Sequence, residues 1–113
     1  MVLTATCHCG AVRVTVPRVP PAVNNCQCSI CRRYGALWAY YRASTVRIEA
    51  GPKATTAYAW RGKTIRFVRC AKCGCVMCWQ WNSAARDRKM GVNARNFPPE
   101  ILRSIRRRHP ESN

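Results

Sequence analysis

Residues 70–74 read CAKCG, and this stretch decides the fold. Two cysteines three positions apart in a tight turn can both face one metal ion about 2.3 Å away, while the amides of the turn point at the sulfurs. Gly74 permits the positive φ with which such a turn ends. The stretch therefore predicts half of a tetrahedral thiolate site, formed by Cys70 and Cys73.

A second cysteine pair closed by glycine lies near the N-terminus, where residues 7–10 read CHCG. Together, Cys7, Cys9 and the pair at positions 70 and 73 make a closed four-thiolate zinc site, with His8 pointing away from the metal. Because all four positions are filled, such a site is structural. The plain alternative is that these cysteines are buried apolar residues.

A rival site is local and uses only the late cysteines, which are Cys70, Cys73, Cys75 and Cys78. It requires the chain to fold back within nine residues and leaves the N-terminal pair without a partner. We therefore expect the long-range pairing, with Cys75 and Cys78 as core thiols. The assignment of Cys75 is the weaker of the two.

The third cysteine group comprises Cys26, Cys28 and Cys31, three thiols within six residues. With no further Cys or His nearby, they predict a catalytic zinc with three protein ligands and one exchangeable position. Arg32 and Arg33 follow directly and can pair with a substrate carboxylate, although a solvated basic turn is the better explanation for at least one of them. The alternative is a second structural site, completed by a remote ligand such as Cys75, Cys78 or His8.

Length and charge limit the possible classes of protein. At 113 residues the chain forms one domain, 1–113. Its formal net charge is +16, which becomes about +13 once seven thiolates hold two Zn²⁺ ions. Such a charge favours anionic partners, either nucleic acid or a small acidic substrate. A compositional bias toward arginine is the alternative explanation.

Cysteine usage predicts the compartment. The nine cysteines are an odd number and cannot pair completely into disulfides. The first residues have neither the basic region nor the apolar run of a signal peptide, and no stretch approaches the length of a membrane span. We expect a cytoplasmic protein, with no membrane partner, that keeps its thiols for metal.

Alternation of apolar and polar residues predicts a mainly β domain whose metal ligands sit at strand ends and turns. A hairpin is expected around residues 61–63, and Pro98 and Pro99 precede a helical turn. The basic tail, residues 106–113, is expected to be frayed. The predicted strands are residues 11–16, 36–41, 46–51, 55–60, 64–69, 76–81 and 90–93.

The order of the three cysteine groups resembles that of the glutathione-dependent formaldehyde-activating enzyme family, which includes the centromere protein V group. The similarity covers residues 5–105. It extends to residues 11–13, Ser29 to Arg32, Tyr58 and residues 91–93. The chain departs from the family pattern at Cys75 and Cys78, where small polar or apolar residues are common.

The resemblance implies a β-tent fold similar to the Mss4-like proteins, built from antiparallel sheets. It implies that Cys7, Cys9, Cys70 and Cys73 hold a structural zinc, and that Cys26, Cys28 and Cys31 hold a catalytic one. The implied activity is that of a carbon–sulfur lyase, the reversible addition of glutathione to formaldehyde to give S-hydroxymethylglutathione.

Two other functions remain open. A non-catalytic zinc module could bind nucleic acid or another acidic partner through the C-terminal arginines, which are Arg103, Arg106, Arg107 and Arg108. The usual reader helix and aromatic stacking signature of nucleic-acid modules are absent from the sequence. A metal or redox sensor would instead use the surplus thiols Cys75 and Cys78.

Overall fold

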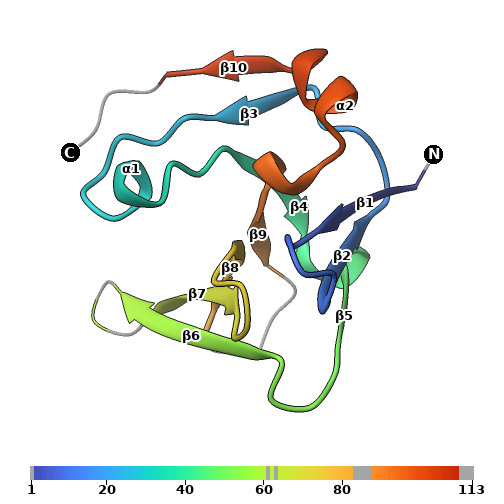
Figure 1. Cartoon of the computed structure of the whole chain (residues 1–113). Coiled ribbons are helices and arrows are strands. Elements are labelled where there is room, and N and C mark those ends of the chain that lie inside the picture. Colours follow the sequence, from blue (N-terminus) through green and yellow to red (C-terminus); the bar gives the residue numbers. More distant parts are fainter. Residues whose placement is uncertain (1, 61, 63, 83–87, 110–113) are drawn as a thin grey trace.

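The structure is a computed structural model and describes residues 2–60, 62, 64–82 and 88–109. Its described strands form two sheets (Figure 1). The smaller sheet has the order β1 (Leu3–Thr6), β2 (Val12–Val16) and β5 (Arg47–Ala50). The larger sheet has the order β10 (Arg106–Arg108), β3 (Ala22–Asn24), β4 (Trp38–Arg42), β9 (Lys89–Asn93), β8 (Val76–Trp81), β7 (Ile65–Cys70) and β6 (Thr55–Trp60).

Helical segments are short. α1 (Cys31–Tyr34) and α2 (Pro99–Arg103) are single turns, and two 3₁₀ turns, η1 (Ala43–Thr45) and η2 (Ala94–Asn96), follow β4 and β9. None of the described helices is long and apolar enough to cross a membrane. The mainly β prediction is therefore confirmed.

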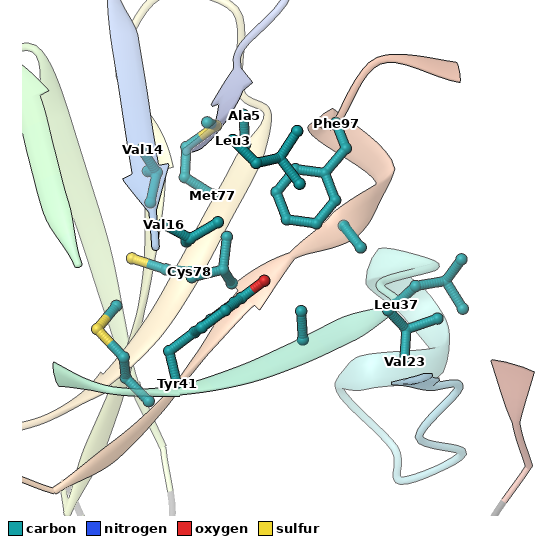
Figure 2. Packing of buried hydrophobic residues seen from close by; sticks show 14 of the residues in the cluster. Leu3, Ala5, Val14, Val16, Val23, Leu37, Tyr41, Met77, Cys78 and Phe97 are labelled. Carbon is teal, nitrogen blue, oxygen red and sulfur yellow. The ribbon is translucent and has the colours of Figure 1, made fainter. Parts of the chain in front are cut away.

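The main hydrophobic core draws on both sheets (Figure 2). Valines at alternate positions of β2 point inward because side chains alternate along a strand, and Val12 and Val14 are fully buried. From the larger sheet, Met77 and Cys78 of β8 and Tyr41 of β4 join the same cluster. This core fixes the smaller sheet against one face of the larger one.

The opposite face of the larger sheet carries a second apolar cluster. It contains Trp38 of β4, Phe67 of β7 and Cys31 of α1, and Trp79 packs against it. Within β4, Ala39 and Tyr41 belong to the main core while Trp38 and Tyr40 belong to this second cluster, as period-2 alternation requires. The candidate active site lies on this second face.

One buried polar side chain ties three elements together. Asn93, at the end of β9, accepts hydrogen bonds from the amides of Leu37 and Arg95, and its own amide donates to the carbonyl of Val76 at 2.9 Å. The side chain is 6 % exposed, and among the described residues it is the buried polar one. It therefore fixes the start of β4 and of β8 relative to the turn after β9.

All seven predicted strands are present, and the hairpin lies at the predicted position. β6 pairs with β7, with Trp60 opposite Ile65 on either side of the turn, of which the structure describes Gly62. The aromatic strand expected at residues 36–41 begins two residues late, because the amide of Leu37 bonds to Asn93 instead of joining the ladder.

The C-terminal tail differs from the prediction. Arg106–Arg108, expected to be frayed, form β10, which pairs in parallel with β3, so the larger sheet is mixed and not purely antiparallel. The strand is anchored by buried Ile105 before it and by a 2.8 Å bond from the amide of Asn25 to the carbonyl of Arg108. All three arginine side chains are exposed, so the strand has no apolar alternation that the sequence could reveal. Residues 110–113 lie outside the described part.

Candidate functional site

The first candidate metal centre brings together Cys7, Cys9, Cys70 and Cys73. The sulfur of Cys9 lies 3.7 Å from that of Cys7 and 3.6 Å from that of Cys70. Four sulfurs placed tetrahedrally about 2.3 Å from zinc are about 3.8 Å apart. The thiols are therefore spaced as a zinc site requires, and the donor set fits zinc chemistry.

Two tight turns position these sulfurs. In the first, the amide of Gly10 donates to the carbonyl of Cys7, and in the second the amide of Gly74 donates to that of Cys70. Both glycines have positive φ, 84° and 80°, which other residues adopt only with strain. The amides of Val12 and Cys73 then donate to the sulfurs of Cys7 and Cys70 at 3.3 and 3.5 Å.

These amides favour thiolate over thiol. The backbone amides of Cys75 and Cys9 lower the pKa of Cys73 to about 5. For Cys70 the amides of Cys73 and Lys72 also lower the pKa, against the opposing effect of burial. Zinc binds the thiolate form. The backbone therefore prepares Cys70 and Cys73 for a metal. Despite an opposing backbone hydrogen bond, hydrogen bonds from neighbouring thiols and desolvation raise the pKa of Cys9 to about 11.

The local alternative among the late cysteines does not form. Cys75 and Cys78 lie outside both cysteine groups of the described residues. Cys78 is fully buried among apolar side chains, and burial raises its pKa to about 12. Cys75 is half-buried and packs against the same core. The two surplus thiols are thus core residues, and a sensor role for Cys78 would need the core to open.

Burial of Cys78 predicts its reactivity and a pH effect. Iodoacetamide at pH 8 is expected to modify Cys78 only after denaturation, whereas Cys75 reacts in the folded protein, as peptide mass spectrometry can show.

The pKa of the Cys78 thiol is 9.0 in the unfolded chain and about 12 in the folded protein. The contribution of the buried neutral thiol to the free energy of unfolding is therefore fully present below pH 9. It is lost as the pH rises from 9 toward 12. A Cys78→Ala variant should show a smaller alkaline loss; an equal loss would contradict the assignment.

The second candidate metal centre comprises Cys26, Cys28 and Cys31, whose sulfurs lie within 4.8 Å of one another. Cys26 and Cys28 belong to the loop after β3, and Cys31 opens α1. No other His, Cys, Asp or Glu of the described residues joins them. In particular, the remote ligands considered from the sequence, His8, Cys75 and Cys78, are not brought to this group.

Hydrogen bonds orient the three thiols. The indole N–H of Trp38 donates to the sulfur of Cys31 at 3.3 Å. Burial raises the pKa of Cys31 above its ordinary value. Burial also raises the pKa of Cys28. The backbone amides of Cys31 and Ile30 and the neighbouring thiols outweigh this effect, so the pKa of Cys28 is lowered. Cys28 therefore forms a thiolate more readily than the more buried Cys31.

A cavity of about 210 Å³ opens beside these three sulfurs. Its walls come from four strands of the second face, β4, β6, β7 and β8, and are almost entirely aromatic. Besides the three cysteines, the lining residues are Trp38, Tyr40, Trp60, Ile65, Phe67, Trp79 and Trp81. A small molecule in this cavity lies against both the rings and the three sulfurs.

Strand register explains why the rings gather. Trp60, Ile65 and Trp81 lie opposite one another across β6, β7 and β8. A second row runs from Phe67 through Trp79 to Gly91. Residues of one row share a face of the sheet and touch side by side. Pairs of rings meet edge to face, with centroids 5.6 Å apart for Trp79 and Trp81.

Gly91 makes room for one of these rings. It stands between Trp79 and Tyr40 in the second row, whose ring centroids are 6.3 Å apart. A Cβ at Gly91 would overlap the indole of Trp79. The residue is therefore glycine for a packing reason, since its φ is not positive.

A Gly91→Ala variant is expected to lose about 1–3 kcal/mol of stability, because the added methyl displaces the Trp79 indole from a packed position. Chemical denaturation measures the loss, and altered tryptophan fluorescence reports the displaced ring. Gly51→Ala is the matched control, since a Cβ there meets no atom within 4 Å. Equal stability of the two variants would contradict the packing role.

The predicted substrate-binding arginines lie beside the site. Arg32 and Arg33 are exposed on α1 and do not line the cavity. The guanidinium of Arg33 donates to the carbonyl of Ser29 at 2.6 Å. Two other cations stack on lining rings: the guanidinium carbon of Arg88 lies 3.6 Å from the ring centroid of Trp81, and Nζ of Lys89 lies 4.7 Å from that of Tyr40.

The sequence prediction missed the aromatic walls and these two cations. A usable signal existed for the walls, since Trp38 and Tyr40, Phe67 and Ile65, and Trp79 and Trp81 are each two positions apart. Period-2 spacing places each pair on one face of its strand. Only long-range pairing, however, reveals that the three pairs share the same face.

Fold and site together define a mainly β protein with two cysteine-based candidate metal centres, one of them beside an aromatic cavity. The family model of the glutathione-dependent formaldehyde-activating enzyme matches residues 2–104. The chain belongs to this family, whose fold is Mss4-like. The resemblance predicted from the cysteine groups is thereby confirmed.

A solved structure supports this placement. The crystal structure of a protein from Rhodobacter sphaeroides is 30% identical in sequence, with a TM-score of 0.74. The similarity covers 94% of this chain and 100% of that chain. No curated protein matches the chain.

Proposed function

We propose that this protein is a zinc-dependent enzyme of the carbon–sulfur lyase type, acting on a small thiol adduct such as S-hydroxymethylglutathione. In the forming direction the thiol sulfur bonds to the carbonyl carbon of formaldehyde, and the thiol proton passes to the carbonyl oxygen. Family membership supports these substrates. The observation that carries the proposal is the three-cysteine group, which borders a cavity and has no fourth ligand among the described residues.

The proposal gives the two cysteine groups different roles. The four-cysteine group holds a structural zinc, and Cys26, Cys28 and Cys31 hold a catalytic one. Zinc bound there supplies Lewis acidity, which lowers the pKa of a coordinated thiol. The chain orients the site through the indole of Trp38, which fixes the Cys31 sulfur. The aromatic walls exclude water and so strengthen the local electrostatic interactions.

The acidic groups of the substrate need cationic partners outside the cavity. Arg32 and Arg33 remain our proposed partners, with Arg33 held toward α1 by its bond to Ser29. The exposed side chains of Arg88 and Lys89, stacked on the walls, add positive charge at the same site. A carboxylate there would be attracted by several cations at once.

The proposal includes a reducing, cytoplasmic location. All nine cysteines are free. Thiolate ligands hold zinc only while they remain reduced, and the cytosol keeps thiols in that state.

NMR exchange spectroscopy tests the activity directly. Zinc-loaded protein is expected to accelerate exchange between hydrated formaldehyde and S-hydroxymethylglutathione over the rate in buffer. Metal analysis of the same sample must give two zinc ions per chain. A protein that holds both ions and leaves the exchange rate unchanged would remove this function.

A second candidate function is binding to nucleic acid, favoured by the exposed arginines of β10. Binding through charge weakens steeply with salt. A filter-binding series against salt concentration tests it, and Arg107→Ser should lower the slope of log Kd against log salt by about 1. A slope that the variant leaves unchanged would exclude β10 as the contact surface.

A further inference from the structure

We propose that the cavity beside the three-cysteine group selects thiol adducts of aromatic or bulky apolar aldehydes over those of formaldehyde. This inference rests on the proposed function, because it names the carbon-side group of the same adduct. It is carried by the lining of the cavity, its volume and the partners of its polar atoms.

Apart from the three cysteines, the lining offers ring faces and no charged side chain. Of the ten lining residues, three are the cysteines and the other seven are aromatic or aliphatic. Their polar atoms are largely occupied: Nε1 of Trp38 donates to Cys31, Nε1 of Trp81 donates to the Lys89 carbonyl at 2.7 Å, and the Tyr40 hydroxyl accepts from Asn24 at 3.1 Å. A ligand group inside therefore meets an apolar surface.

The volume exceeds what a formaldehyde adduct needs. The cavity measures about 210 Å³, which is larger than an apolar cavity of about 150 Å³ that binds benzene. A hydroxymethyl group has two heavy atoms and leaves most of this space unfilled. A hydroxybenzyl group adds six ring carbons and can stack edge to face on the walls, as the rings already do with one another.

The charged tripeptide of glutathione does not suit the interior. Its carboxylates and amine would lose water without gaining a partner among the lining residues, which is unfavourable for any charge. The cations that stack on the walls, Arg88 and Lys89, are exposed. The ligand therefore lies with its aromatic end against the rings and sulfurs and its charged end among the cations.

The chemistry is the same addition and needs no further reactant. The thiol sulfur bonds to the carbonyl carbon of an aromatic aldehyde, the C=O double bond becomes a single bond, and the thiol proton ends on that oxygen. The reverse step breaks the C–S bond and returns the proton to sulfur. No electron is gained or lost.

Trp60 and Trp81 are the residues that set this preference. They form one wall from β6 and β8, on either side of Ile65. Neither contacts the sulfurs in the way that Trp38 does. Replacing either tryptophan by alanine enlarges the cavity and removes stacking surface, and it leaves the three cysteines unchanged.

Calorimetric titration with stable thioethers tests the inference. Zinc-loaded protein is expected to bind S-benzylglutathione at least tenfold more tightly than S-methylglutathione, since an apolar pocket discriminates by about that factor for a single methylene. Trp60→Ala and Trp81→Ala should each bring this ratio toward one, while Trp60→Phe retains most of it. Tyr58→Ala is the matched control, because Tyr58 lies on the same strand, is 46% exposed and does not line the cavity.

Equal or weaker binding of the benzyl thioether by the wild-type protein would overturn the inference. So would a preference that both tryptophan variants retain, with two zinc ions bound. These outcomes are independent of the proposed function, because formaldehyde exchange can be present when the benzyl preference is absent. If the protein prefers the benzyl thioether but catalyses no exchange, the assignment as a lyase is wrong. The inferred class of ligand is still supported in that case.

Discussion

Replacing Cys73 by Ser is expected to unfold the protein. The substitution removes one of four sulfurs that together join the N-terminal turn to the end of β7. Structural zinc contributes on the order of 10 kcal/mol of folding free energy, whereas the net stability of a domain is only about 5–15 kcal/mol. Circular dichroism should show loss of the β spectrum at 25 °C, and metal analysis a loss of zinc.

Cys75→Ser is the control for this experiment. Cys75 lies two positions further along, is half-buried and belongs to neither cysteine group of the described residues. Its variant should keep two zinc ions and melt near the wild type. A strong chelator should reproduce the Cys73→Ser result in the unaltered chain. A melting curve that neither the chelator nor Cys73→Ser shifts would show that the four thiols do not hold a structural metal.

Replacing Cys28 by Ser is expected to remove activity and to leave the fold intact. The exchange rate should fall by roughly 100-fold or more, since even a change beside a metal ligand commonly lowers activity 10- to 100-fold. The fold should survive because Cys28 lies in a loop at the edge of the second face, away from the main core. Zinc content should drop from two ions to one.

Ser29→Ala provides the comparison within the same loop. The Ser29 side chain is exposed, and its carbonyl, which accepts from Arg33, is unchanged by the substitution. This variant should keep two zinc ions and full activity. If Cys28→Ser and Cys73→Ser both lower activity while keeping the fold, the division into a structural and a catalytic site is wrong.

Local pattern was sufficient for much of the fold. The hairpin of β6 and β7 and the strand at residues 76–81 could be predicted because apolar alternation and a short turn are encoded within a few residues. The cysteine groups were also predictable, since metal geometry limits which spacings can share an ion.

The rest depends on contacts that no local pattern encodes. β10 is three exposed arginines, and only backbone pairing with β3 makes it a strand. The aromatic cavity arises from register across β6, β7, β8 and β4, which brings Trp60 and Tyr40 to one face. Arg32 and Arg33 follow Cys31 directly in sequence, yet in the single turn of α1 both side chains are exposed and neither lines the cavity.

The proposed structural zinc site of the four-cysteine group also has a consequence for the timing of biosynthesis. Cys9 and its partner Cys70 are 61 residues apart, so the nascent chain exposes the N-terminal pair for about 3–12 s before the second pair emerges, at about 5–20 residues per second. During this interval the compact group at residues 26–31 is already complete and can capture metal first. On the proposed function, closure of the long loop is therefore the last step of maturation, and a cell short of zinc should accumulate chains that have not completed it.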